Sequence, residues 1–245
     1  AITRCCSGHK LRGLKNLGVD EISYKRRHRY LTVVYDLDRH HVVWVGEGKG
    51  RKTIDGFFRD VMSKGQRARV ETACCDMSKA YTGAISEHLP GALLVLDRFH
   101  IIKALNEAVD EVRKEVWRVS SKADRKELRG LRFILLKSKK NRTRREHQVM
   151  AEMGRTQRRV ARACELKDEL SHFWTYSYIG SAEKFLRRWK KKAKLSRIAP
   201  LRKFARTLEE HWDGVMASVV GITNAVAEGI NRLIRMAKNR ASGYL

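Results

Sequence analysis

The order of the apolar segments constrains the fold of this chain more than any other feature. Five short segments are typical of strands, at residues 17–22, 30–35, 42–45, 69–75 and 92–96. Apolar residues at helical spacing follow the third segment, where Thr53 is placed to cap a helix through Met62, and the fourth, at 78–88. From His100 onward the spacing is helical, with a break expected near Pro200. The sequence therefore predicts an α/β sheet that starts with a hairpin and is followed by helices.

The chain is strongly basic, with 53 Lys and Arg against 27 Asp and Glu and a formal net charge of +26. The excess is uneven, +7 over residues 1–100 and +19 over residues 101–245. This charge is well beyond what solubility requires and makes nucleic acid the leading partner. The sequence has no Walker-type glycine loop or dinucleotide fingerprint, so an ATP-driven enzyme is disfavoured.

The five cysteines have no C-x-x-C spacing, so neither a disulfide framework nor a complete zinc site is predicted, and a reducing cytoplasm fits. No secretory segment opens the chain and no run of about 18 apolar residues occurs, so neither export nor a membrane span is indicated. The chain begins at Ala1, a few residues before its first expected strand, as a fragment would.

Acidic side chains occur at three places that a fold could bring together. Asp20 and Asp76 each come where an apolar segment stops, and strand ends of an α/β sheet border its functional crevice. Glu228 lies on a late helix, where it shares a polar face with Asn224 and Asn231. Each aspartate could instead cap a turn or helix, and the polar face is either solvated or turned towards a site. Converging carboxylates would bind divalent cations, which cleavage of a nucleic acid backbone requires.

Asp97 and His100 close the fifth apolar segment and open the next helix. Asp97 suits the N-cap position and His100 the third helical position, so capping alone could explain both. In a functional interpretation, His100 anchors the local backbone or contacts DNA near the carboxylates.

Two basic runs stand out in the helical part of the chain. The residues predicted to bind DNA phosphates are Lys139, Lys140, Arg142, Arg144 and Arg145 in the first run, and Arg187, Arg188, Lys190, Lys191, Lys192, Lys194 and Arg197 in the second. A charge run is ordinarily a solvated helix face, but a net charge of +26 favours phosphate contact. Trp189, inside the second run, either stacks on a base or anchors its helix in the core.

Taken together, several segments closely resemble the DDE catalytic domain of ISL3-type insertion-sequence transposases. The matching segments are Val19-Asp20-Glu21-Ile22, the stretch from Arg29 to Asp36, Asp76-Met77-Ser78, Leu89-Pro90-Gly91-Ala92, Asp97-Arg98-Phe99-His100, and Thr223-Asn224 with Glu228-Gly229-Ile230-Asn231. The resemblance runs from about Leu17 to Leu245. It implies an RNase H-like mixed sheet with a large all-helical insertion before the last catalytic helix. The implied parts are a truncated linker (1–16), the first part of the core (17–100), the helical insertion (101–215) and the Glu-bearing end of the core (216–245).

The resemblance also implies roles for single residues. Asp20, Asp76 and Glu228 match the catalytic carboxylates, which would hold two Mg²⁺ or Mn²⁺ ions. Asp97 and His100 match the D-x-x-H motif of the family. The two asparagines on the polar face of the last helix, Asn224 and Asn231, would support the site.

The function that the resemblance implies is metal-dependent DNA cleavage and strand transfer that moves an insertion sequence. The expected partners are transposon ends and target DNA, bound by a homo-oligomer associated with the nucleoid. Family members usually carry an amino-terminal zinc-binding and helix-turn-helix region, which this sequence does not contain. The alternative is therefore a truncated or inactive transposase remnant that binds DNA without catalysis. A third class, a basic RNA-binding structural protein, is disfavoured by the carboxylate set.

Overall fold

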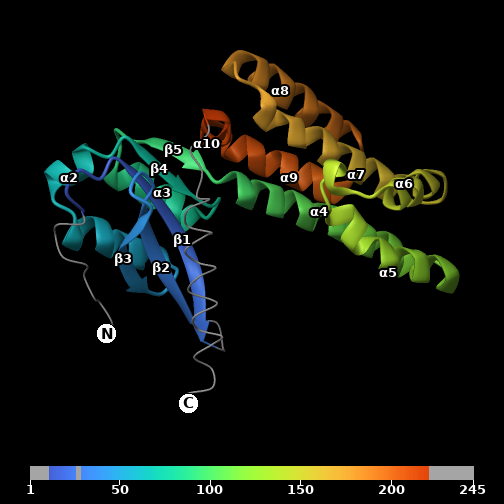
Figure 1. Ribbon diagram of the computed structural model, residues 1–245, viewed down its shortest axis with the longest axis horizontal. Coiled ribbons are helices and arrows are strands. Elements are labelled where there is room, and N and C mark those ends of the chain that lie inside the picture. Colours follow the sequence, from blue (N-terminus) through green and yellow to red (C-terminus); the bar gives the residue numbers. More distant parts are fainter. Residues whose placement is uncertain (1–10, 26–28, 221–245) are drawn as a thin grey trace. The chain divides into compact units, whose positions relative to one another are not determined.

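The computed structural model describes residues 11–25 and 29–220, drawn in colour in Figure 1. The chain divides into two compact units. We call residues 1–100 with 213–245 the sheet unit and residues 101–212 the helical unit. The expected insertion, 101–215, has bounds within three residues of the helical unit. In the described residues no helix is both long and apolar enough to cross a membrane.

The sheet unit contains one five-stranded mixed sheet. Its strands are β1 (Asn16–Lys25), β2 (Arg29–Asp36), β3 (His41–Glu47), β4 (Thr72–Cys75) and β5 (Leu93–Leu96). They lie in the order β3-β2-β1-β4-β5, and β1 is antiparallel to β2 but parallel to β4, which is parallel to β5. A hairpin-first mixed sheet of this order is consistent with the RNase H-like architecture, and the predicted fold class is confirmed.

The two faces of the sheet have different coverings. On one face, the Thr32 hydroxyl lies 3.2 Å from the Tyr81 hydroxyl of α3 (Lys79–His88). The neighbouring residue Val33 must point the opposite way, because side chains alternate along a strand. It belongs to a buried cluster with Cys74, Val95 and Ala217, the last from α10 (Trp212–Ala217). Gly18 of β1 is opposite Cys74, so Asp20 and Ile22, which follow it at every second position, point their side chains to the face of this buried cluster.

Local signals explain where the short helices lie and correct three expectations. The helix expected to be capped by Thr53 begins earlier, as α1 (Arg51–Gly56), and continues in the π-helical turn η2 (Phe57–Val61). The Thr53 hydroxyl instead donates to the Glu47 carbonyl at 3.2 Å. A helix that was not predicted, α2 (Lys64–Ala68), follows, because Ser63 and Gln66 form a reciprocal capping box. The strand expected from residue 69 consequently begins only at Thr72.

The helical unit is built from long amphipathic helices. These are α4 (Arg98–Val119, which starts in the sheet unit), α5 (Lys122–Leu136), α6 (Arg144–Thr156), α7 (Arg158–Leu170), α8 (Ile179–Leu195) and α9 (Ala199–Glu210), with the short 3₁₀ turns η3 (Lys139–Asn141) and η4 (Ser171–Thr175). The described part of the chain after His100 contains no strand, as expected. The predicted break precedes Pro200, which lies in the first turn of α9, where its missing amide costs nothing.

Candidate active site

Asp20 does not end its strand, as the sequence suggested, but lies inside β1. That strand pairs with β4 only over Asn16–Gly18, where Gly18 is opposite Cys74, and then continues alongside β2 to Lys25. Asp20 follows Gly18 by two residues, and Asp76, the first residue after β4, follows Cys74 by two. The charge of Asp76 acts on Asp20, so the two residues lie near each other at this edge of the sheet.

The same register continues into the next strand. Cys75 is opposite Leu96 in the β4–β5 pair, and the Asp97 amide donates to the Cys75 carbonyl at 2.8 Å. Asp76 and Asp97 are therefore also neighbours. Asp20 is two residues after Gly18 in β1, so its side chain lies on the face of the sheet that carries the buried cluster. Asp76 and Asp97 come directly after β4 and β5, and the charges of both act on Asp20.

The electrostatics of Asp20 fit this crowding. Burial raises the pKa of Asp20 above its usual value, and the charges of Asp76 and Asp97 raise it further. The backbone amide of Glu21, which donates to Asp20 at 2.7 Å, and the charge of His100 oppose this rise. The side chain of Asp20 is only 14% exposed. An ionised carboxylate at this position therefore costs free energy that a bound cation would offset.

His100 lies between two of these aspartates. Its Nε2 atom is 3.8 Å from Asp20 Oδ1 and 3.9 Å from Asp97 Oδ2. Asp97 is 3% exposed, precedes α4 and accepts a hydrogen bond from the Phe99 amide at 3.1 Å, which is the geometry of an N-cap. The capping interpretation of Asp97 therefore holds, and in the same arrangement α4 brings His100 to Asp20.

The sequence also left open that Asp76 caps a turn or a helix, and the structure shows a turn. Its Oδ1 accepts from the Ser78 amide at 2.9 Å, which is an Asx-type turn, and Ser78 holds the N-cap position of α3. This turn uses one carboxylate oxygen of Asp76 and directs the chain from β4 into α3.

The structure does not test the third predicted carboxylate. Glu228, together with Asn224 and Asn231, lies outside the described residues. In the part of the chain that the structure describes, no three His, Cys, Asp or Glu side chains are grouped so that they could hold a metal ion. The described part thus supplies the aspartates and His100 of the candidate site, and not a complete ligand set.

One residue beside the site was not singled out from the sequence. The Phe99 ring meets the His100 ring edge to face, with centroids 5.4 Å apart and planes at 90°, and Phe99 is 51% exposed. Its only sequence signal is its place inside the Asp97–His100 motif, since a phenylalanine is more often buried than exposed.

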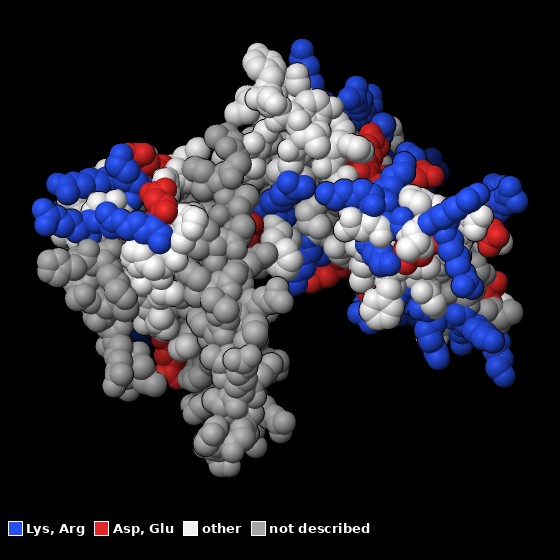
Figure 2. All heavy atoms as spheres, in the orientation of Figure 1, with Lys and Arg blue, Asp and Glu red and all other residues white. Residues whose placement is uncertain are grey.

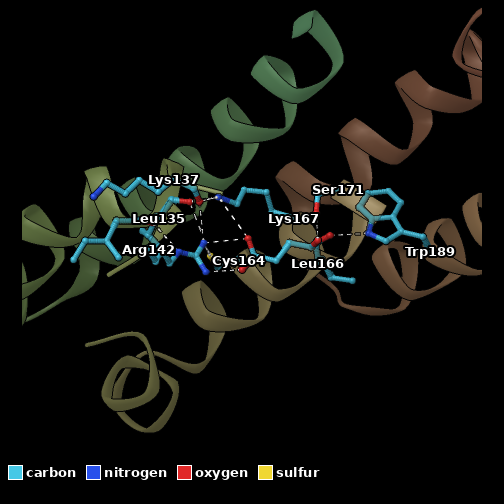
Figure 3. Close-up of polar contacts among 10 residues, drawn as sticks. Leu135, Lys137, Arg142, Cys164, Leu166, Lys167, Ser171 and Trp189 are labelled. Atoms are coloured by element: carbon cyan, nitrogen blue, oxygen red, sulfur yellow. Dashed lines mark hydrogen bonds and ion pairs between the residues drawn. The ribbon is translucent and has the colours of Figure 1, made fainter. Parts of the chain in front are cut away.

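The first basic run contains one residue that the structure removes from the predicted DNA surface. Arg142 is 8% exposed and forms a bidentate pair with Asp168, at 2.6 and 3.1 Å (Figure 3). It also donates to the carbonyls of Ile134 and Lys137 near the end of α5. The guanidinium is buried and its donors are used within the protein, so the expectation that Arg142 contacts phosphate was wrong. The other cations predicted in this run, Lys139, Lys140, Arg144 and Arg145, are exposed.

The second basic run is also divided between interior and surface. Trp189 is fully buried and its indole donates to the Leu166 carbonyl at 2.7 Å, so it anchors α8 in the core (Figure 3). Lys190 and Lys194 pair with Glu209, at 2.7 and 3.0 Å, and Lys192 pairs with Glu169 at 2.6 Å.

Other members of this run remain available to a partner. Arg187 is exposed and pairs with Glu183 of its own helix. Three further cations are exposed and make no ion pair with any described residue: Arg188, Lys191 and Arg197. Lys and Arg side chains project from many points of the helical unit in Figure 2. Part of the predicted basic surface is therefore neutralised within the protein, and part faces solvent.

A five-stranded mixed sheet that begins with a hairpin, followed by a large helical unit, is typical of proteins with an RNase H-like core. The chain belongs to the ISL3 family of transposases, since the family model described as "Transposase" matches residues 17–245. It is 31% identical over 235 residues to the transposase for insertion sequence element IS1001 of Bordetella parapertussis. It is 29% identical over 256 residues to the transposase for insertion sequence element IS1557 of Mycobacterium tuberculosis.

These alignments cover 94% of this chain in both cases, but 58% of the first relative and 57% of the second. The chain thus spans less than three fifths of the length of either curated relative. The family assignment confirms the resemblance stated from the sequence.

Proposed function

We propose that this chain is the catalytic part of a DDE-type transposase, which cleaves DNA and joins the freed strand to target DNA with the help of divalent cations. The observation that supports the proposal is the parallel pairing of β1 and β4, which ends at Gly18 and Cys74, two residues before Asp20 and Asp76. Family membership supports the reaction class. The proposed partners are the ends of an insertion sequence, its target DNA and further copies of the chain.

The residues present fit a divalent cation. Burial raises the pKa of Asp20, and the nearby charge of Asp76 raises it further. Carboxylate oxygens are hard donors that suit Mg²⁺ or Mn²⁺ rather than zinc. Asp20, Asp76 and Glu228 would hold the two ions, which when bound supply an activated water or 3′-hydroxyl and stabilise the leaving oxygen.

The other residues of the site have positioning roles in this proposal. Asp97 fixes the first turn of α4 by accepting from the Phe99 amide, and this turn holds His100 near Asp20. A positive charge on His100 keeps Asp20 ionised, because it lowers the pKa that burial raises. The exposed cations of the helical unit bind DNA phosphates without regard to sequence.

The test replaces Glu228 with Gln in the reading frame that contains this chain, and measures cleavage and strand transfer on labelled DNA ends with Mg²⁺. We expect transfer to fall by at least about two orders of magnitude, as for the loss of one essential group, with DNA affinity within about twofold. The matched control is Glu87→Gln, because Glu87 is an exposed acid at the end of α3. Unchanged transfer by Glu228→Gln would contradict the assignment. Intact DNA binding with no transfer by the unmodified protein would favour the alternative, a remnant that binds DNA without catalysis.

A further inference from the structure

An exposed aromatic ring lies beside the candidate active site. The exposed large aromatic residues among those described are Phe99, Phe133 and Tyr178, and only Phe99 belongs to the sheet unit. A single exposed apolar side chain is ordinary on a protein surface and has no meaning by itself. The position of Phe99 is what distinguishes it from the other two.

The ring is held in a defined place. The Phe99 amide donates to Asp97 Oδ1 at 3.1 Å, which fixes the backbone at the start of α4. The ring contacts the His100 imidazole edge to face at 5.4 Å, and that imidazole is 3.8 Å from Asp20. The His100 imidazole therefore lies between the Phe99 ring and the Asp20 carboxylate. Half of the surface of Phe99 faces solvent.

A DNA strand that brings a phosphate to Asp20 and Asp76 also brings the adjoining base to this region. Nucleobases have apolar faces, and aromatic side chains bind them by stacking with little preference for sequence. Stacking requires a base that has left its duplex partner, which strand cleavage and joining make available. A half-exposed phenyl ring with a fixed backbone is suited to receive such a face, since little side-chain freedom is lost.

We propose that Phe99 is a base-stacking residue, which receives an unpaired nucleobase next to the phosphate held at Asp20 and Asp76. This inference rests on the proposed function of those aspartates. The stacked base orients the strand, so that the phosphate reaches the carboxylates in one position. The ligand class is an unpaired nucleotide of either strand end, and base identity is not read.

The experiment measures the affinity of the protein for oligonucleotides that carry the DNA end, in Ca²⁺, which we expect to support binding without chemistry. A single abasic nucleotide is moved one position at a time past the cleavage site. At one position the abasic nucleotide should weaken binding of the unmodified protein by about five- to 150-fold, the range that stacking of one base supports. Phe99→Ala should weaken binding to intact DNA by a similar factor and add no further loss on DNA that is abasic at that position.

Two further variants separate stacking from folding and from hydrophobicity. Phe99→Trp should keep the base-dependent affinity, whereas Phe99→Leu, which has apolar volume but no ring, should lose it. Phe133→Ala is the matched control, because Phe133 is a 72% exposed phenylalanine of α5, and it should behave as the unmodified protein. A melting temperature of Phe99→Leu within about 2 °C of the unmodified protein shows that its fold is intact.

Several results would overturn the inference. Equal affinity of Phe99→Leu and the unmodified protein on every oligonucleotide would do so, as would a decrease in affinity that is the same with and without the base. Failure of the proposed function gives a different pattern, in which the unmodified protein does not cleave DNA or in which cleavage survives Glu228→Gln. If the unmodified protein cleaves DNA and Glu228→Gln does not, but the affinity of the Phe99 variants does not depend on the base, the stacking role of Phe99 is wrong and the proposed function still holds.

Discussion

Asp20 and Asp76 each come two residues after the last pair of the parallel β1–β4 register, Gly18 and Cys74, although 56 residues separate them in the sequence. Burial raises the pKa of Asp20, and the charges of Asp76 and Asp97 raise it further, so the ionised form of Asp20 costs free energy in the folded protein. Active sites commonly carry such a cost because the same crowding binds cations. We therefore expect the stability of the protein to depend on pH and on bound metal.

We expect Asp20→Asn to stabilise the protein at pH 7, by about 0.5–2 kcal/mol, the usual range when strain at a functional site is relieved. The pKa of Asp20 is raised in the folded state, so the folded state disfavours its ionised form at pH values above this pKa. As the pH falls through the raised pKa, the unmodified protein regains stability and the gain from Asn shrinks. Urea unfolding at pH 7 and pH 4.5 measures both values.

At pH 7, bound metal should make the unmodified protein more stable than Asp20→Asn, the reverse of the order expected without metal. A ligand that binds only the folded state at 100 times its Kd adds about 2.7 kcal/mol. Excess Ca²⁺ should therefore raise the melting temperature of the unmodified protein more than that of Asp20→Asn. Asp60→Asn, at an exposed aspartate of η2, is the control and should respond to Ca²⁺ as the unmodified protein does. An equal response of Asp20→Asn would exclude Asp20 as a metal ligand.

Much of the sheet unit was predictable because its signals are local. The five apolar segments and the Asp76-Met77-Ser78 turn are visible in the sequence, and the β-strands lie at or within three residues of the expected bounds. The extension of β1 to Lys25 was not predictable, because it depends on pairing with β2 after β4 has ended. The parallel pairing of β1 with β4, which brings the segments of Asp20 and Asp76 together, is likewise a property of the assembled sheet.

The basic runs show the limit of charge patterns more clearly. Arg142 has its acidic partner Asp168 26 residues away, and Lys190 has Glu209 19 residues away. Sequence spacing does not show such pairs, so buried and exposed cations of one run look alike. Only the folded helices decide which positive charges reach solvent.

Arg142 should contribute to stability and not to DNA affinity. Arg142→Ala would remove the bidentate partner of Asp168, whose side chain is 15% exposed, and leave it only the longer contact with Lys167 at 3.7 Å. It would also remove a donor from the Ile134 carbonyl, whereas the Lys137 carbonyl would keep its hydrogen bond from Lys167. Breaking a buried pair in this way costs about 3–5 kcal/mol. We expect that decrease in urea unfolding, whereas Arg144→Ala, at an exposed residue of α6, should change stability by less than about 0.5 kcal/mol. If Arg142→Ala instead lowered the salt dependence of DNA binding and left stability unchanged, Arg142 would be a phosphate-binding residue.

The second basic run offers two double variants that remove the same charge from one helix. Arg188 and Lys191 are exposed and unpaired among the described residues of α8, whereas Lys190 and Lys192 pair with Glu209 and Glu169. Replacement of Arg188 and Lys191 by Gln should lower DNA affinity and flatten the slope of log affinity against log salt by about 0.9 for each phosphate that the protein no longer neutralises. Replacement of Lys190 and Lys192 by Gln should leave that slope nearly unchanged, because their charges are already neutralised within the protein. Titration of labelled duplex between about 50 and 200 mM salt, a range in which such slopes are well resolved, measures both variants. Equal flattening by the two variants would mean that net charge and not direct phosphate binding governs affinity, and no flattening by either would place the DNA on another surface.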